Sequence, residues 1–477
     1  MISDQRTESR RTGSLKPTVR RLSLALFAAD ALLIVGVFNV VASLRGVRLP
    51  GDPLLLVELL PPLALLLFAL YLIDGHSPRT DLVSVDYASQ HMIAVSLAAI
   101  GTLLLTFVII PQNDASRDVL RSSRGVILIS FIALAPLTLG LRRGIRLHYQ
   151  RLHGQRSIVF VGTRLQCQSF REDYARNGMQ LPLILAEVSD QTASPFPDSS
   201  GNHRDLPALL DQIQRGALAV EAIVLRESGR DLEPLATERL LALYFAGVPT
   251  FTLEFFHEVY WRKIPLYRLN RTWLFQEGFQ IARDPAFARL KRLSDIVLSS
   301  LGLILASPLI LAAAAAIWCE DRGPVFFRQD RTGRNGLPFP LLKLRTMRVR
   351  AEAGDPYTRP GDSRITRVGG FLRASRIDEF PQLWNVLRGH MSLIGPRAEW
   401  VRLVQDYEAK IPCYHYRHLV KPGITGWAQV NYPYGANLED TQRKLEFDLY
   451  YIRHFSFLMD AAIVMKTIHV MLFGKGR

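Results

Sequence analysis

The chain has few cysteines and no cluster of them. Among its 477 residues there are three, Cys167, Cys319 and Cys413. Their wide separation excludes the paired spacing of zinc and redox sites and indicates a reduced protein that faces the cytoplasm. Nucleic-acid-binding motifs are also missing, so the net charge of +15 does not indicate nucleic acid as a partner. Anionic membrane lipid and phosphorylated substrates are simpler partners for this charge.

The segment from Arg156 to about residue 255 lacks a complete dinucleotide-binding fingerprint. Only Gly162 follows the first predicted strand, where G-x-G-x-x-G needs three glycines. Strands and helices nevertheless alternate there, which predicts a doubly wound, Rossmann-like parallel sheet. The predicted strands are Ser157–Gly162, Leu183–Val188, Ala222–Leu225 and Thr250–Leu253, the helices Leu165–Asn177 and Glu233–Phe245, and the loop Ser189–Asn202. A scaffold or regulatory module is favoured, and nucleotide binding is the alternative.

Long apolar runs are what the sequence has in excess, with 48% hydrophobic residues. At ~20 residues per spanning helix, four runs are roughly long enough to cross a membrane: Leu22–Leu44, Leu54–Ile73, His91–Ile110 and a marginal one at Gly125–Leu141. Arginine and lysine flank both ends of this set, so both ends are predicted to be cytoplasmic. Asp30 in the first run is tolerable only if it faces another helix or lies near the membrane interface.

A fifth apolar run, Ile296–Trp318, carries Ser307 and Pro308 near its middle. Proline removes a backbone hydrogen bond, so a kink is expected there. A helix that crossed the membrane would place the rest of the chain outside, away from nucleotide substrates. We therefore expect a re-entrant helix that returns to the cytoplasmic side, with an ordinary kinked span as the alternative. The preceding linker, with Trp273 and Tyr267 among basic residues, suits a membrane interface or a packed connector.

Two neighbouring carboxylates, Asp378 and Glu379, are the centre of the stretch Leu372–Glu399. Pro381 and Gly389 bracket a short predicted helix, so both carboxylates lie near a helix N-terminus, where anions bind. Before them come three basic motifs, G-P-V-F-F-R-Q-D-R-T-G at 323, K-L-R-T-M at 343 and R-I-T-R-V-G at 364. Arginine pairs bidentately with phosphate oxygens, so these motifs predict a phosphate-binding surface. A solvated or lipid-facing surface is the alternative.

These motifs, with K-R-L-S-D-I at 291, K-P-G-I-T-G-W-A-Q-V at 421 and D-L-Y-Y-I-R at 448, resemble the bacterial sugar transferase family. The large polyprenyl-phosphate phosphoglycosyl transferases of this family begin exopolysaccharide and O-antigen assembly. The resemblance extends from Lys291 to the C-terminus, and N-Y-P-Y-G-A-N at 431 is similar to a subgroup linked to exopolysaccharide export. It implies transfer of a sugar-1-phosphate from a UDP-sugar to undecaprenyl phosphate, with release of UMP.

The same resemblance implies a multi-pass protein of the bacterial inner membrane whose catalytic domain faces the cytoplasm. The expected fold is membrane α plus α/β, with a mixed, mainly helical catalytic domain. The expected segments are a cytoplasmic tail (1–21), a four-helix transmembrane domain (22–150), a Rossmann-like domain (151–255), an interfacial linker (256–290), a re-entrant helix (291–320) and the catalytic domain (321–477). We also expect a homodimer.

The resemblance assigns different roles to the two carboxylates, Asp378 as the nucleophile that forms a phosphosugar-enzyme intermediate and Glu379 as a ligand to Mg²⁺. Adjacent helical residues point ~100° apart, so one shared role is not expected. Substrate binding is expected of Arg373, Arg376, Arg397, Lys343, Arg345, Arg328, Arg331 and Gln382. The chain departs from the family pattern at Phe380, at His390 and at Ala398, which replaces the second proline of a Pro-Arg-Pro motif.

Other functions and sites compete with this interpretation. An isolated Asp-Glu pair would most simply be a helix cap with salt bridges to Arg373 and Arg376. A membrane scaffold or sensor would be favoured had either carboxylate been lost. An NAD-dependent nucleotide-sugar dehydratase is opposed by the incomplete glycine motif and by the absence of Tyr-x-x-x-Lys in residues 156–255. His415 and His418 have the spacing of metal ligands, but a surface or packed role is favoured for them.

Overall fold

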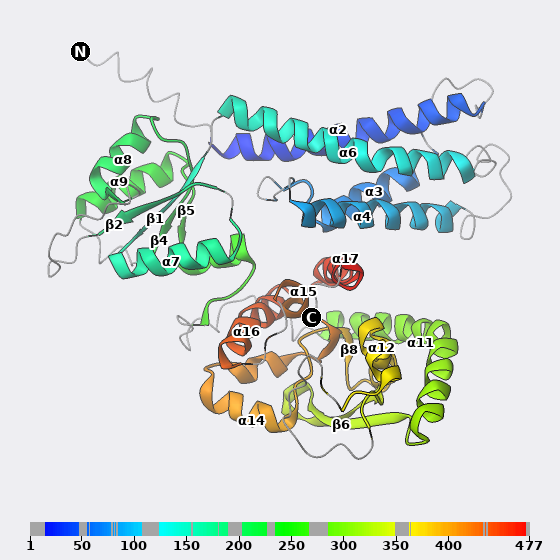
Figure 1. The fold of residues 1–477 in the computed structure, drawn as a ribbon. Helices are drawn as coiled ribbons and strands as arrows, with labels where there is room; N and C mark the ends of the chain where they lie inside the picture. The colour runs from blue at the N-terminus through cyan, green and yellow to red at the C-terminus, as the bar shows by residue number, and fades with distance from the viewer. Residues whose placement is uncertain are drawn as a thin grey trace, which may run out of the picture. The chain divides into compact units, whose positions relative to one another are not determined.

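The computed structural model forms two compact units, Met1–Trp261 and Arg262–Arg477 (Figure 1). It describes residues 15–46, 55–56, 58–77, 80, 82, 84–106, 124–153, 156–179, 181–188, 203–226, 234–266, 285–348, 362, 364–432, 435 and 437–473. Several sequence predictions lie outside these residues: the loop 189–202, Tyr267 and Trp273 of the linker, and most of the cytoplasmic tail.

Four helices make up the first part of the N-terminal unit: α2 (Leu15–Leu44), α3 (Leu60–Leu72), α4 (Val85–Leu104) and α6 (Arg124–His153). Three of them contain stretches long and apolar enough to cross a membrane, Leu22–Leu44, Tyr87–Leu104 and Arg124–His148. A fourth such helix, α11 (Pro285–Asp321), lies in the C-terminal unit. These helices indicate a membrane protein.

The second predicted span is shorter in the structure than the sequence suggested. Helix α3 has 13 residues, below the ~20 that a membrane crossing needs. Its proline pair stands at the first helical positions, where a missing N–H is harmless, so the helix begins there instead of continuing back to Leu54. The fourth predicted span, which was marginal by length, belongs to a 30-residue helix, since α6 continues through its basic C-terminal part.

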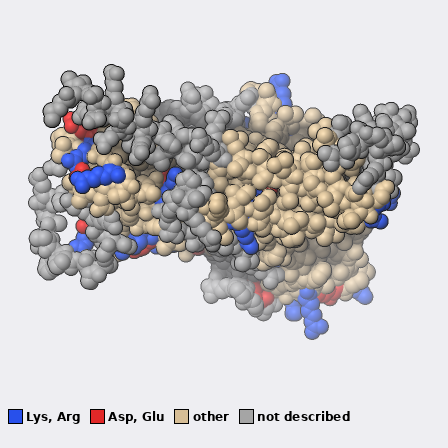
Figure 2. All heavy atoms as spheres, turned by 90° about the horizontal axis from the view of Figure 1, so that it is seen from above, with Lys and Arg blue, Asp and Glu red and all other residues tan. Residues whose placement is uncertain are grey.

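The outward surface of these helices is largely apolar, whereas the charged side chains of Asp30 and Arg142 are buried. Leu32, Val40, Ile100 and Ile132 are exposed. Figure 2 shows a broad uncharged surface over this part of the molecule, with most lysines and arginines at its margins. Such a surface suits contact with lipid.

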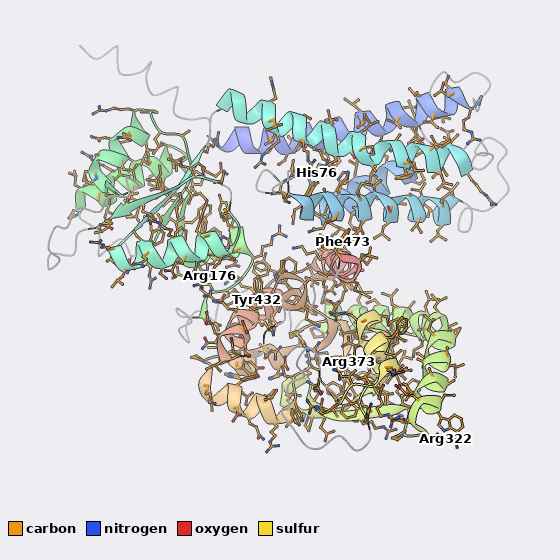
Figure 3. All side chains as sticks on the ribbon, viewed as in Figure 1. His76, Arg176, Arg322, Arg373, Tyr432 and Phe473 are labelled. Carbon is orange, nitrogen blue, oxygen red and sulfur yellow. The ribbon has the colours of Figure 1, made fainter. Side chains whose placement is uncertain are left out.

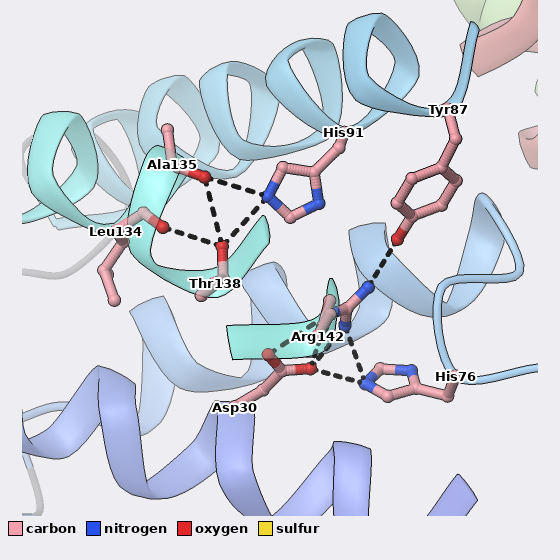
Figure 4. A network of polar contacts seen from close by, with 8 residues as sticks. All are labelled: Asp30, His76, Tyr87, His91, Leu134, Ala135, Thr138 and Arg142. Atoms are coloured by element: carbon pink, nitrogen blue, oxygen red, sulfur yellow. Dashed lines mark hydrogen bonds and ion pairs between the residues drawn. The ribbon is translucent and has the colours of Figure 1, made fainter. Parts of the chain in front are cut away.

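Between these helices lies a buried polar network that joins four chain segments (Figure 4). Arg142 of α6 donates from Nε to Asp30 Oδ2 of α2 at 3.0 Å and from Nη1 to Tyr87 Oη of α4 at 2.6 Å. His76, in the turn after α3, has Nε2 at 3.0 Å from the same Asp30 oxygen. The sequence-based condition on Asp30 is therefore met, because its carboxylate faces another helix and is paired.

Gly75 provides the space that this network needs. A Cβ there would overlap the Arg142 guanidinium, and it would lie 2.7 Å from Tyr87 Oη and 2.9 Å from the Leu70 carbonyl oxygen. The guanidinium therefore packs directly on the backbone of the turn after α3, an approach that only glycine allows.

The second part of this unit is a five-stranded parallel sheet, which confirms the predicted parallel pairing. The strand order is β3-β2-β1-β4-β5. The strands are β1 (Ser157–Gly162), β2 (Leu183–Glu187), β3 (His203–Asp205), β4 (Val220–Leu225) and β5 (Thr250–Thr252). Their bounds agree closely with the four predicted strands, whereas β3 was not predicted because its three residues, His-Arg-Asp, carry no apolar pattern.

Helices cover both faces of the sheet. Against one face pack α8 (Leu206–Gln214) and α9 (Pro234–Phe245), through residues such as Leu210 and Leu240. Against the other pack α7 (Arg164–Arg176) and the short helix α10 (Leu253–Phe256), through Phe170 and Phe256. The result is three layers, as Figure 1 shows.

The C-terminal unit is mixed and mainly helical. It contains an antiparallel hairpin of β6 (Phe326–Thr332) with β7 (Pro338–Leu344) and a parallel pair of β8 (Ser392–Ile394) with β9 (Gly423–Thr425). Its helices besides α11 are α12 (Arg367–Ser375), α13 (Gln382–Leu387), α14 (Val401–Lys410), α15 (Trp427–Asn431), α16 (Leu438–Arg453) and α17 (Phe457–Phe473). The largest core cluster gathers around Tyr414, Leu445 and Tyr451.

Helix α11 is bent part-way along its length (Figure 1) and carries Pro308 in its interior. Its first turns are fixed to the rest of the unit by buried polar groups. Lys291 Nζ lies 2.5 Å from Asp460 Oδ2, and Asp295 accepts hydrogen bonds from Ser392 Oγ and from the Leu393 amide, both at 3.0 Å. Beyond these turns the helix exposes an apolar surface, which includes Leu301, Ile304, Leu305 and Leu311.

Candidate active site

The two carboxylates lie in a short 3-10 turn, Ile377–Glu379, that follows α12. Arg376 ends α12 in the left-handed conformation, with φ of 58°, and so turns the chain into the dyad. Such a backbone is strained for a residue other than glycine, and strain of this kind gathers at functional sites. The next helix, α13, has six residues and begins after Pro381, close to the prediction.

The surroundings push the pKa values of the two carboxyl groups in opposite directions. Burial raises the pKa of Asp378 above its ordinary value, and the charges of Lys343 and Arg373 only partly oppose this. Burial also acts to raise the pKa of Glu379, but the charges of Lys343 and Arg397 outweigh it and hold the pKa below its ordinary value. Asp378 is therefore the more basic of the pair and Glu379 the more firmly ionised.

Lys343 forms an ion pair with the dyad. Its Nζ lies 2.9 Å from Glu379 Oε1, and both side chains are largely buried. Lys343 stands on β7, and the dyad is held against that strand by Asn385 of α13. The Asn385 side chain accepts a hydrogen bond from the Leu342 amide at 2.9 Å and donates one to the Pro340 carbonyl oxygen at 2.7 Å. Sequence reasoning missed Asn385, because nothing in the run L-W-N-V-L distinguishes it from a surface asparagine.

Beside the dyad lies a small cavity with a basic lining. Its polar lining residues are Arg331, Lys343, Gln382 and Arg397, and the others are Leu341, Met391, Ala398, Gly423 and Ile424. Gln382 is buried, with 4% of its surface exposed, so its amide serves the cavity and not the solvent. Three cations around one cavity can hold phosphate oxygens.

The structure brings four of the predicted substrate-binding residues to this cavity and two more to the dyad. Arg373, labelled in Figure 3, donates from Nε to Thr346 Oγ1 at 2.8 Å, and its charge lowers the pKa of Asp378. The charge of Arg376 likewise lowers the pKa of Glu379. Both lie close to the dyad without lining the cavity.

Two further predicted residues, Arg328 and Arg345, are not part of the cavity lining. Arg328 stands three positions before Arg331 on β6, so the alternation of side chains along a strand places the two on opposite faces, and Arg328 is exposed. Arg345 forms an ion pair with Asp321 at the end of α11. Their role in substrate binding stays a prediction.

Magnesium binding, which the family resemblance implies, stays a prediction, and a carboxylate pair is chemically compatible with it. Mg²⁺ takes one or two carboxylates and completes its coordination with water and substrate phosphates. Among the described residues no group of three or more His, Cys, Asp and Glu side chains gathers, so the protein offers no closed metal cage there. His418 is buried, and burial and the charge of Arg417 lower its pKa to about 3, so it remains a packed neutral side chain.

Comparison with known proteins assigns the family. The model for bacterial sugar transferases matches residues 286–474, which contain the dyad and the whole cavity lining. The UDP-glucose:undecaprenyl-phosphate glucose-1-phosphate transferase of Caulobacter vibrioides is 45% identical over 185 residues, 38% of this chain and 69% of the relative. The chain belongs to the bacterial sugar transferase family.

Other bacterial sugar transferases match over different shares of their length. The UDP-N-acetylgalactosamine-undecaprenyl-phosphate N-acetylgalactosaminephosphotransferase of Aeromonas hydrophila is 39% identical over 269 residues, 56% of this chain and 63% of the relative. The UDP-glucose:undecaprenyl-phosphate glucose-1-phosphate transferase of Klebsiella pneumoniae is 45% identical over 182 residues, 37% of this chain and 39% of the relative. The chain thus covers less than two thirds of these two relatives.

Proposed function

We propose that this protein transfers a sugar-1-phosphate from a UDP-sugar to undecaprenyl phosphate and releases UMP. The observation that carries the proposal is the pair of unlike carboxylates, Asp378 and Glu379, beside a cavity lined by Arg331, Lys343 and Arg397. The names of the relatives give the same substrate classes.

In the first step Asp378 attacks the phosphorus that carries the sugar. A bond forms between a carboxylate oxygen and this phosphorus, and the bond from the phosphorus to the bridging oxygen breaks. UMP leaves with that oxygen. Asp378 suits this role because its raised pKa makes it the more basic of the two carboxylates. The cations of the cavity hold the phosphate oxygens and stabilise the charge that develops on them.

In the second step an oxygen of undecaprenyl phosphate attacks the same phosphorus and displaces Asp378. The product is the lipid diphosphate sugar, and the Asp378 carboxylate is restored. Glu379, held ionised beside Lys343, would bind Mg²⁺. The ion, when bound, supplies positive charge to the phosphates.

The surface near α11 supports access for a lipid phosphate. Phe371 of α12 and Trp384 of α13 are 67% and 46% exposed, on helices that pack against α11. Arg388 stacks over Trp384, with its guanidinium carbon 5.3 Å from the ring centre. Aromatic and basic side chains together suit the membrane interface. We propose that α11 is a re-entrant membrane helix that returns to the side from which it entered. The catalytic unit then lies on the cytoplasmic face of the inner membrane.

The remaining predictions from the sequence are retained as part of the proposal. The strand order around β1 supports a Rossmann-like domain within residues 151–255. In the sequence this domain follows the membrane helices and precedes the catalytic domain. The reaction would begin the assembly of an exopolysaccharide or O-antigen repeat unit. A homodimer remains a prediction.

Release of UMP tests the reaction directly. Purified protein, given undecaprenyl phosphate, Mg²⁺ and either UDP-glucose or UDP-N-acetylgalactosamine, should release UMP from at least one of them. Asp378→Asn should abolish the release. With UDP-sugar alone, the wild type should gain the mass of one sugar phosphate on the peptide that contains Asp378.

Asp406→Asn is the matched control, because Asp406 is an exposed aspartate on α14. It should keep full activity. Release of UDP instead of UMP, or full activity of Asp378→Asn, would contradict the proposed reaction. Folded but inactive wild-type protein would favour the scaffold alternative.

A further inference from the structure

A buried polar network contacts the backbone of Arg397. Arg417 donates from Nη2 to Asp448 Oδ2 at 2.8 Å, from Nε to the same oxygen at 3.1 Å and from Nη1 to Tyr414 Oη at 2.7 Å. Arg417, Tyr414 and Asp448 are 5%, 1% and 1% exposed. The same Nη2 also donates to the backbone carbonyl oxygen of Arg397 at 3.1 Å.

The segment around Arg397 is fixed by hydrogen bonds from several elements. The Gly395 amide donates to the Thr425 carbonyl oxygen, and the Gly423 amide donates to the Pro396 carbonyl oxygen, both at 2.9 Å. On the other side, Arg331 Nη1 donates to the Ala398 carbonyl oxygen at 3.2 Å. Between these two sets of hydrogen bonds, the Arg417 side chain donates to the backbone carbonyl oxygen of Arg397.

The hydrogen bond from Arg417 to the Arg397 carbonyl oxygen matters because the next residue, Ala398, is not a proline. A proline at this position would fix the backbone φ at about −65° and stiffen the segment by itself. Alanine imposes no such restriction, so the orientation of Arg397 depends on its hydrogen bonds. We propose that Arg417, held by Asp448, is a positioning residue that fixes the backbone of Arg397 and so directs its guanidinium into the cavity.

Arginine suits this role because its planar fork reaches two acceptors at once. One edge pairs with the Asp448 carboxylate, and Nη2 at the same time reaches the Arg397 carbonyl oxygen. Lysine has a single side-chain nitrogen, so it cannot donate to the Asp448 carboxylate and to the Arg397 carbonyl oxygen in this geometry. Arg417 does not line the cavity, so it acts on the substrate through Arg397 and is not itself a catalytic residue.

The test is a double-mutant cycle, and it rests on the proposed function because its readout is UMP release. Arg417→Lys keeps the buried positive charge beside Asp448 and loses the fork. We expect it to lower kcat/KM for the UDP-sugar by about tenfold. In the Arg397→Ala background the same substitution should change kcat/KM less than about twofold, because there is no longer a guanidinium to position.

A second variant separates positioning from folding. Arg417→Met, Asp448→Leu and Tyr414→Phe together replace the buried polar groups by apolar ones of similar size, which usually keeps or raises stability. We expect an unchanged or higher melting temperature with the same loss of kcat/KM. Arg402→Lys is the control, because Arg402 is an exposed arginine on α14; it should leave both quantities unchanged.

The outcomes distinguish this inference from the proposed function. Wild-type protein that releases no UMP contradicts the proposed function. If the wild type is active, equal losses from Arg417→Lys with and without Arg397 contradict the positioning role. A fully active apolar triple variant contradicts it as well.

Discussion

At the scale of single residues, one lysine sets the chemistry of the dyad. Asp378 and Glu379 are neighbours in the chain, yet only Glu379 is in direct contact with Lys343. The same lysine also lowers the pKa of Asp378, which burial holds above its ordinary value. The identity of these three residues was predicted from the motifs. Their pairing was not, because it depends on how the Asn385 side chain holds α13 against β7.

Lys343→Met should move the acid limb of the pH–rate profile to higher pH. Removal of the charge raises the pKa of Asp378 further, so the carboxylate becomes protonated, and therefore unreactive, at a higher pH than in the wild type. The measurement is single-turnover release of UMP without undecaprenyl phosphate, which keeps the titration of the lipid phosphate out of the profile.

Lys410→Met provides the comparison for this shift, since Lys410 is an exposed lysine at the end of α14. Its profile should match that of the wild type. An acid limb that stays in place in Lys343→Met, or moves to lower pH, would contradict the assignment of Asp378 as the group that must be ionised.

At the scale of elements, the bounds of strands and helices were predicted best where they depend on a local pattern of residues. The strand Ser157–Gly162 has the predicted bounds because its apolar run is bounded by polar residues. The span Leu54–Ile73 was predicted too long because hydropathy does not show where the proline pair begins the helix. In the site, Arg331 and Arg328 looked alike in the sequence, and they separate only once both are placed on strand β6, where they lie on opposite faces. Which of the two faces meets the cavity depends on long-range packing, which was not available from the sequence.

Two adjacent glycines of α12 should respond oppositely to alanine. A Cβ at Gly369 would overlap the backbone of Thr346, so Gly369→Ala must push α12 away from the strand that carries Lys343, at a cost of about 2 kcal/mol. A Cβ at Gly370 meets nothing within 4 Å, so Gly370→Ala should raise stability by about 0.5–1 kcal/mol. Thermal unfolding in detergent measures both. Equal effects of the two substitutions would show that α12 does not pack on Thr346 in this way.

Gly75 provides a corresponding test in the membrane helices. Gly75→Ala should displace the Arg142 guanidinium and leave the buried Asp30 without its arginine partner, at a cost of about 3–5 kcal/mol. Gly140→Ala, on α6 with open space around it, is the control and should not destabilise the protein.

The cost at Gly75 should depend on the ion pair. In a background with Asp30→Leu and Arg142→Met, the Gly75→Ala substitution should cost clearly less, as expected for residues that share one network. A cost that stays the same in that background would mean that Gly75 acts through the turn itself and not through the Arg142 guanidinium.

At the scale of the whole molecule, two compact units join at Trp261 and Arg262. The residues directly after this junction pack against the catalytic unit. The Ile264 amide donates to the Glu446 carbonyl oxygen at 3.0 Å, and Lys263 Nζ lies 3.2 Å from Glu446 Oε2. The catalytic unit thus includes part of what the sequence presented as a linker, because composition does not show which partner a connecting segment will pack against.

Labelling of cysteines tests the course of α11 through the membrane. Cys319 is exposed near the end of this helix, and Arg289 is exposed near its start. In a variant with Arg289→Cys, a membrane-impermeant maleimide should label both positions from the same side of sealed vesicles if α11 is re-entrant. Labelling from opposite sides would establish a helix that crosses. Cys413→Ser keeps the half-buried third cysteine from contributing.

The ion pair of Asp30 and Arg142 has a consequence for the order in which the protein is made. The two residues are 112 positions apart, so at about 5–20 residues per second the ribosome adds Arg142 about 6–22 seconds after Asp30. If α2 enters the membrane during that interval, its aspartate lacks the arginine, a penalty of about 3 kcal/mol that its apolar residues can offset. The first helix is therefore able to insert alone, but the N-terminal helices reach their final packing only when the last of them arrives.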